Sequence, residues 1–216
     1  MSPSGSDQSA QPRRSGTGVR PGPRVRVGRP ANQSRRPGAH RAGLALLFAA
    51  MSLAAAQART FLSVDEALAL AFPGCAVERR TVFLTDAQKA RAASLAGEEI
   101  AGAIVNPYVA LKDGRIEGTA YFDAHRVRTL PETLMIVVAP DGTVRRIEVI
   151  AFREPEDYLP KGAWYGQFSG QALDPGLSLK GRIRGVTGAT LTARATTSAV
   201  RRVLAIHRAI GEGGAP

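Results

Sequence analysis

Four extended segments followed by one long amphipathic helix constrain the fold of this chain more than any other feature. From residue 104 the hydrophobic period changes from helical to strand-like. Strands are expected at residues 105–111, 115–123, 132–139 and 143–152. Turn sequences join them in pairs at Asp113-Gly114 and Pro140-Asp141-Gly142, and residues 192–210 carry one apolar helical stripe that stops at Gly211. The pattern predicts an α+β fold, in which an antiparallel sheet with at least one solvated face is flanked by helices.

Two helices are expected before the sheet. Residues 63–72 form the first, because Ser63 and Glu66 have the spacing of a capping box and a Pro-Gly pair follows. Thr85 caps a longer helix, which is expected to end near Gly102. Shorter expected elements are a strand at 80–84, a helical turn at 163–168 and an extended segment at 182–186.

The basic charge of the chain is concentrated before residue 42. Residues 1–41 hold nine arginines and a single acidic residue, so they carry +8 of the net charge of +11 and leave +3 for the remainder. This stretch is rich in Ser, Gly, Pro, Gln and Arg and has few large apolar residues, which predicts a disordered basic tail. A patch for nucleic acid or acidic lipid in this tail is the less favoured alternative, and no nucleic-acid partner is expected for the folded part.

Residues 42–56 form an apolar run that is preceded by Arg35, Arg36 and Arg41 and followed by Ala56-Gln57-Ala58. A basic region, a short apolar core and an A-x-A site are typical of a secretory signal peptide, with cleavage expected after Ala58. The run is shorter than the roughly 20 residues of a transmembrane helix, although an uncleaved membrane anchor stays open. Both alternatives predict that the rest of the chain is exported and faces the periplasmic or extracytoplasmic side.

The segment with the clearest chemistry is Gly-Val-Thr-Gly-Ala-Thr-Leu-Thr at residues 185–192, just before the last helix. The first amides of a helix have no partner within it, and the helix dipole is positive there, so this position favours an anion such as phosphate. Gly188 and Ala189 leave room for a ligand beside the backbone, and Thr187, Thr190 and Thr192 supply hydroxyls. The residues alone leave an ordinary helix-capping turn open.

The run Thr187-Gly188-Ala189-Thr190-Leu191-Thr192 resembles a (Ser/Thr)-Gly-Ala-Thr-x-(Thr/Ser) motif of the FMN-binding domain. That domain occurs in flavin-bearing subunits of sodium-translocating NADH:quinone reductase and Rnf-type complexes, and in small exported proteins. The resemblance implies that a flavin transferase joins the phosphate of FMN to Thr190, and that residues 187–189, 191 and 192 bind the cofactor. It extends more weakly over residues 100–210, including 132–152 and the EPEDYLP…W..QF.G stretch. The family motif usually begins with Asp where this chain has Arg184, so non-covalent FMN, or none, stays an alternative.

The resemblance also assigns the stretch 154–170 to the neighbourhood of the flavin. Its aromatic residues either stack on the isoalloxazine or fill the core; they are Tyr158, Trp164, Tyr165 and Phe168. Its polar residues either bond the polar edge of the flavin or belong to a surface loop; they are Glu154, Asp157 and Gln167. We take Trp164 and Glu154 as the cofactor-binding candidates. Arginines near the motif, which either neutralise a phosphate or are solvated, are Arg182, Arg184 and Arg194.

The implied function is electron transfer through FMN, with a redox protein of a membrane or periplasmic chain as partner. No Ser-His-Asp or Cys-His pattern and no metal-ligand spacing is apparent, and His125 and His207 are interpreted as surface or packing residues. Two alternatives stay open: an exported flavoenzyme that reduces a small substrate, and a cofactor-free binding protein of the same fold. The expected organisation is a tail at 1–41, a signal peptide or anchor at 42–58, a helical part at 59–99 and an FMN-binding domain at 100–211.

Overall fold

The computed structural model describes residue 22 and residues 59–212. The expected signal peptide or anchor, and all of the expected basic tail except residue 22, lie outside the described residues. Residues 59–212 belong to one compact unit. Within the described part of the chain, no helix is both long enough and apolar enough to span a bilayer.

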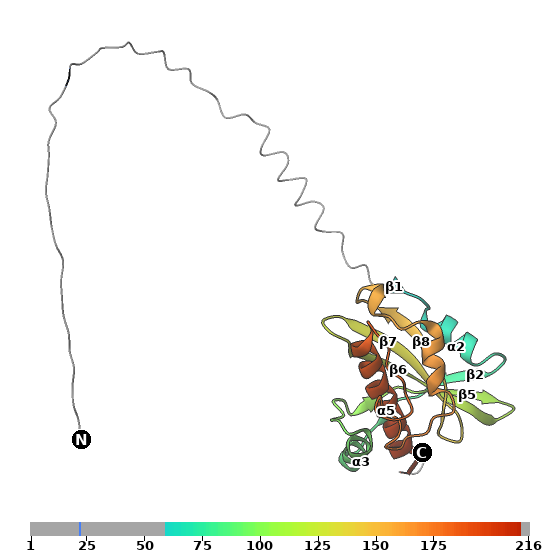
Figure 1. Ribbon diagram of the computed structural model, residues 1–216. Helices are drawn as coiled ribbons and strands as arrows, with labels where there is room; N and C mark the ends of the chain where they lie inside the picture. The colour runs from blue at the N-terminus through green and yellow to red at the C-terminus, as the bar shows by residue number, and fades with distance from the viewer. Residues whose placement is uncertain (1–21, 23–58, 213–216) are drawn as a thin grey trace, which may run out of the picture. The chain divides into compact units, whose positions relative to one another are not determined.

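An antiparallel sheet forms the centre of this unit, and its six strands in the described residues follow the order β1-β8-β7-β6-β5-β2 (Figure 1). The strands are β1 (Arg59–Thr60), β2 (Ala76–Arg79), β5 (Tyr108–Lys112), β6 (Arg115–Arg126), β7 (Pro131–Val138) and β8 (Val144–Phe152). A separate two-stranded antiparallel sheet pairs β3 (Val82–Phe83) with β4 (Ile104–Val105). The α+β class is therefore confirmed, and strands β1 and β2 join residues 59–99 to the same sheet as the residues that follow.

The two expected turns join neighbouring strands of the sheet. Asp113 and Gly114 have φ angles of 51° and 78° and connect β5 to β6. Positive φ at both central residues is what a two-residue hairpin of this twist requires, which explains the Asp-Gly pair. Gly142, with φ of 80°, lies in the turn between β7 and β8, where the Asp141 carboxylate accepts a hydrogen bond of 3.0 Å from the Thr143 amide. Local turn chemistry thus sets the pairing beside each turn, whereas the register shifts at Ala110/Leu111 and Thr133/Leu134 lie away from the turns.

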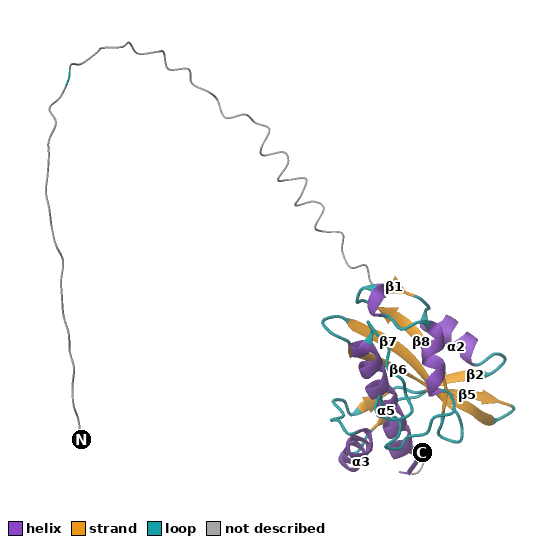
Figure 2. Ribbon diagram, viewed as in Figure 1, coloured by secondary structure: helices purple, strands orange, loops and turns teal. Residues whose placement is uncertain are grey.

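Helices cover both faces of the sheet (Figure 2). Helix α5 (Thr190–Glu212) packs on one face with α3 (Asp86–Ala96), against apolar side chains that include Leu134, Ile136 and Val138. Helix α2 (Val64–Ala71) packs on the opposite face against Met135 and Val137. The expectation of one solvated face is therefore wrong for β7, whose unbroken apolar run reflects burial on both sides.

Helices α2 and α3 begin at the expected capping residues, but α3 ends earlier than expected, at a glycine. The Ser63–Glu66 capping box of α2 is confirmed, with a hydrogen bond of 2.8 Å from the Ser63 amide to the Glu66 carboxylate. Helix α3 ends at Ala96, earlier than expected, because Gly97 adopts a left-handed conformation with φ of 78°. The shorter elements are η1 (Glu156–Tyr158), α4 (Gly162–Tyr165) and η2 (Gly166–Phe168). The segment at 182–186, which was expected to be extended, is a loop that pairs with no strand among the described residues.

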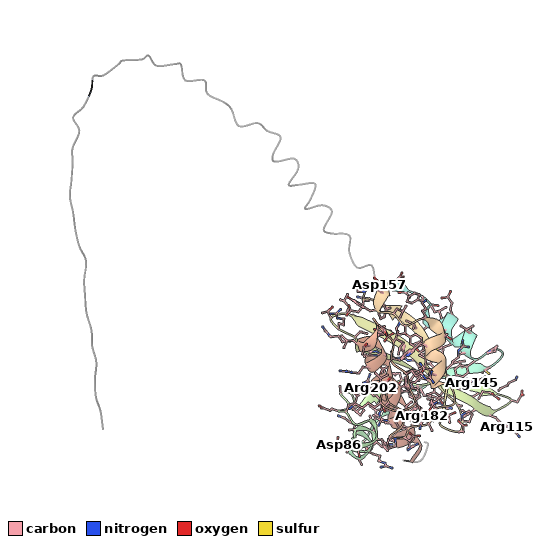
Figure 3. All side chains as sticks on the ribbon, viewed as in Figure 1. Asp86, Arg115, Arg145, Asp157, Arg182 and Arg202 are labelled. Carbon is pink, nitrogen blue, oxygen red and sulfur yellow. The ribbon has the colours of Figure 1, made fainter. Side chains whose placement is uncertain are left out.

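A buried polar network joins the end of β6 to α5. His125 and Glu132 face each other across β6 and β7, and His125 Nε2 lies 3.0 Å from the fully buried Glu132 carboxylate. The other ring nitrogen lies 2.9 Å from Asp123, which also accepts two hydrogen bonds from Arg202 on α5 (Figure 3). Glu98 pairs with the same guanidinium. The network connects the sheet, the segment after α3 and the last helix through charged side chains.

The pKa of His125 makes the stability of this network depend on pH. Burial opposes the charged ring, but hydrogen bonds to Asp123 and Glu132 outweigh burial and raise its pKa from 6.5 to about 9. Because the pKa of His125 is higher in the folded than in the unfolded chain, its contribution to the free energy of unfolding is complete below pH 6.5. This contribution is lost as pH rises through about 9.

We therefore expect the free energy of unfolding to fall between pH 6.5 and pH 9.5 by on the order of 2 kcal/mol. Urea unfolding at both pH values measures it. The decrease should shrink in His125→Gln and persist in His207→Gln, because burial lowers the pKa of His207 and keeps that ring neutral over this range. An equal decrease in His125→Gln and wild type would contradict the assignment.

Candidate functional site

The site is centred on the first turn of α5. The Ala189 carbonyl accepts a hydrogen bond of 2.9 Å from the Ala193 amide, so Ala189 is the N-cap and Thr190 the first helical residue. Gly188, with φ of 85°, reverses the chain just before the cap. The amides of Thr190, Leu191 and Thr192 consequently have no carbonyl partner within the helix. The helix thus begins two residues earlier than expected and presents three amide donors at the motif.

The three threonines of the motif have different surroundings. Thr192 is fully buried, and its hydroxyl donates a hydrogen bond of 2.5 Å to the Tyr158 carbonyl of η1. Thr187 is exposed. Thr190 is also exposed, and its hydroxyl lies 3.2 Å from the Val186 carbonyl at the start of the helix. Thr192 therefore attaches the first helical turn to η1, while Thr190 keeps an accessible hydroxyl.

The loop before the helix is held by side chains of α4 and η2. The Trp164 indole donates a hydrogen bond of 2.6 Å to the Arg184 carbonyl, and the Arg184 amide donates one of 2.9 Å to the Gln167 side chain. The indole packs edge-on against Tyr165 and Phe168 in the core. Trp164 therefore positions the loop through its N–H group and its packing, and it does not line the pocket described next.

A pocket of about 140 Å³ lies at the helix start, lined by Arg128, Tyr158, Gly188, Ala189, Thr190, Leu191 and Thr192. The volume is well below the roughly 300–1,000 Å³ of pockets that enclose a whole drug-sized ligand. A phosphate with part of its ester chain fits this size, whereas a tricyclic ring does not. No carboxylate belongs to the described lining, whose residues carry hydroxyls and one guanidinium and include the first three residues of α5. This donor set is suited to a phosphate.

Arg128 is the pocket residue that the sequence did not indicate. It lies between β6 and β7, far from the motif along the chain, and its guanidinium carbon is 4.9 Å from the centre of the Tyr158 ring. The Arg128 side chain is exposed, and a cation over an aromatic face is a favourable contact that keeps it beside Tyr158. No spacing rule connects the tip of this hairpin to the start of α5, so only the folded chain reveals the pairing.

Glu154 shapes the hairpin tip that carries Arg128. One oxygen of its buried carboxylate accepts hydrogen bonds from the amides of Arg128, Thr129 and Leu130, at 3.2, 2.7 and 2.8 Å. The bond from Leu130 is the main cause that lowers the pKa of Glu154, and burial opposes it. Glu154 is therefore placed behind the site, as an acceptor for the turn, and not in the pocket lining.

The remaining candidates lie around the pocket or in the core. Tyr158 lines the pocket, whereas Tyr165 and Phe168 are buried in the core on the α5 face of the sheet. Arg182 forms an ion pair of 2.7 Å with Asp174. Side chains that are exposed and outside the pocket lining are Asp157, Arg184 and Arg194. The structure thus brings five motif residues together with Arg128 and Tyr158.

Comparison with known families identifies the ligand class. Residues 130–205 match the FMN-binding domain. The match supports the assignment of this part of the chain to an FMN-binding domain family. The match runs from the start of β7 into α5 and includes every lining residue of the pocket except Arg128. FMN is accordingly the cofactor that the family indicates, and its phosphate agrees with the donor set. A search of curated proteins found no match to this chain.

The Glu154 contacts lead to a stability prediction. Glu154→Ala should lower the free energy of unfolding by about 2 kcal/mol at pH 7, because three turn amides lose a charged acceptor. Since the pKa of Glu154 is lowered from 4.5, this contribution is complete above pH 4.5 and is lost as pH falls further. Urea unfolding measures the difference between the variant and wild type. The matched control is Asp157→Ala, which removes a nearby exposed carboxylate. Equal stability of the two variants at pH 7 would show that the turn does not depend on Glu154.

Proposed function

We propose that this protein is an exported electron-transfer protein that carries FMN through a phosphoester bond to Thr190. The observation that supports this best is the separation of roles among the motif threonines. Thr190 is the one whose hydroxyl is accessible at the pocket, since Thr192 is buried against Tyr158 and Thr187 lies outside the lining. The family indicates FMN, and the amide donors at the helix start favour its phosphate.

Attachment of this kind requires an activated phosphate. The Thr190 hydroxyl loses its proton to a base or to solvent, and its oxygen forms a bond to the flavin-side phosphorus of a flavin dinucleotide. The phosphoanhydride bond breaks, and a nucleoside monophosphate leaves with the bonding electron pair. The hydroxyl starts 3.2 Å from the Val186 carbonyl, an acceptor that orients it at the surface where a flavin transferase reaches it.

The size of the pocket supports an exposed position for the flavin ring. A pocket of about 140 Å³ would accommodate the phosphate but not a tricyclic ring, so the isoalloxazine would remain outside it. The bound ring accepts and releases one or two electrons. A ring at the surface is within reach of a redox protein, which is the reason for proposing electron transfer to a partner of a membrane or periplasmic chain.

Export is part of the same proposal. It rests on the basic region, the apolar run at 42–56 and the A-x-A site, which direct the domain to the compartment where we expect the transferase to act. The chain therefore reaches its flavin after translocation, either as a cleaved periplasmic protein or held by its apolar segment.

The attachment site is tested by intact mass. The full chain, expressed with a flavin transferase, should carry a mass increase of one FMN less one water and show flavin fluorescence in a denaturing gel. Thr190→Ala should lose both signals, while Thr187→Ala, an equally small change at the residue just before the lining, should keep them. Near-ultraviolet circular dichroism of each variant verifies folding.

Two results would contradict the proposal. Flavin that remains in Thr190→Ala after denaturation would place the linkage elsewhere. A wild-type protein without any adduct in the presence of the transferase would exclude the covalent form under those conditions. The mass of the wild-type chain also reports whether residues 1–58 have been removed.

A further inference from the structure

We propose that Arg128 is the residue whose guanidinium binds the phosphate of FMN at Thr190, during attachment and in the finished phosphodiester. This inference rests on the proposed function, because it assigns a partner to the phosphate of that site. Arg128 precedes the matched residues 130–205, so the family match does not assign it a role.

The backbone around Arg128 is held from two directions. At the base of the hairpin, His125 and Glu132 are cross-strand partners joined by a hydrogen bond of 3.0 Å. At the tip, the Glu154 carboxylate binds three consecutive amides, the first of which belongs to Arg128 itself. A turn held at both ends places its side chain with little loss of backbone entropy when a ligand arrives.

The guanidinium of Arg128 also contacts an aromatic ring. It lies 4.9 Å from the centre of the Tyr158 ring, and the Tyr158 carbonyl accepts the hydroxyl of Thr192, the third residue of α5. Tyr158 therefore connects Arg128 to the same helical turn that contains Thr190. A stacked guanidinium keeps its N–H groups at the edge of its plane, where they remain available to an anion.

Arg128 also differs from Arg146, Arg182 and Arg202 in its charge environment. Arg146, Arg182 and Arg202 each form an ion pair with a carboxylate. Among the residues that the structure describes, no such ion pair is found for Arg128, and the described pocket lining contains no acidic side chain. An arginine that lines a pocket without a carboxylate in its described lining, beside the first amides of a helix, is suited to a phosphate.

The guanidinium of Arg128 and the phosphate of FMN have complementary geometry. A guanidinium donates two parallel N–H bonds to two phosphate oxygens, whereas an ammonium acts as a single point of charge. In the transfer step the flavin-side phosphorus gains a bond to the Thr190 oxygen and loses its bond to the nucleotide. Arg128 neutralises the two oxygens that take no part in this exchange. The same contact then persists in the product, where the diester keeps one negative charge.

The test compares Arg128→Met, Arg128→Lys and the matched control Arg115→Met in the full chain. Arg115 lies at the exposed start of β6, and Figure 3 shows it far from Asp157, the neighbour of Tyr158. Arg115→Met therefore removes the same charge away from the pocket. The measurements are the rate of adduct formation by intact mass and the ³¹P resonance of the attached phosphodiester. Circular dichroism verifies that each variant folds.

We expect attachment to slow by about tenfold in Arg128→Met, less in Arg128→Lys, and not at all in Arg115→Met. The ³¹P resonance should shift in the loaded Arg128→Lys protein and be unchanged in Arg115→Met. Slower attachment with an unchanged ³¹P resonance would mean that Arg128 serves docking of the transferase, which overturns the inference. Wild-type rate and resonance in both Arg128 variants would overturn it too.

These outcomes are distinct from failure of the proposed function. A wild-type chain that carries no FMN contradicts the phosphoester at Thr190 itself. A wild-type chain that carries FMN, together with Arg128 variants that behave like wild type, leaves the proposed function intact and removes only the role of Arg128.

Discussion

The buried carboxylate of Glu132 is the interaction on which the arrangement of this domain depends. A charged group without contact to solvent is costly unless donors surround it, and Glu132 has donors from three directions. His125 contacts it across the hairpin, Tyr165 donates from α4 at 3.2 Å, and Thr196 donates from α5 at 3.3 Å. Any shift of α5 or of α4 relative to β7 would leave part of this carboxylate without a partner. The last helix is thus positioned by a polar requirement as well as by its apolar stripe.

The position of the helix determines the geometry of the cofactor site. Thr196 is one turn after Thr192, so contact with Glu132 and contact with η1 follow from the same helix face. The next residues toward the start of the helix are Leu191 and Thr190, which the same rotation turns outward. The exposed hydroxyl of Thr190 is therefore a consequence of how its neighbours are buried. The unpaired amides of this turn then supply the donors that a phosphate needs.

The hairpin between β6 and β7 is also positioned by acidic side chains. Its base contains the His125–Glu132 pair, and its tip is shaped by Glu154 from the segment after β8. Two acidic residues, one at each end, thereby hold a short turn beside the first turn of α5. Neither is part of the pocket lining. Their role is to place Arg128 opposite the motif and beside Tyr158 of η1, so the polar groups of the site come from three separate parts of the chain.

Local sequence patterns predicted much of this structure. The paired strands, the Asp-Gly turn, the Ser63 capping box and the final helix each depend on residues close together in sequence, and each is present. The motif at 187–192 likewise indicated a helix start with hydroxyls. The end of α3 was mispredicted, because a single glycine in a left-handed conformation ended an otherwise helical pattern. The segment at 182–186, expected to be extended, is a loop held by hydrogen bonds to Trp164 and Gln167.

The sequence by itself therefore determined which segments form strands and helices, and which threonines stand at the helix start. Only the tertiary structure decided that Trp164 supports a loop, that Glu154 binds a turn and that Arg128 enters the pocket. The physical reason is that periodicity, capping and turn chemistry act over a few residues, whereas these contacts join distant segments. They depend on strand register and on which helix face is buried, and both are settled by the packing of the whole domain.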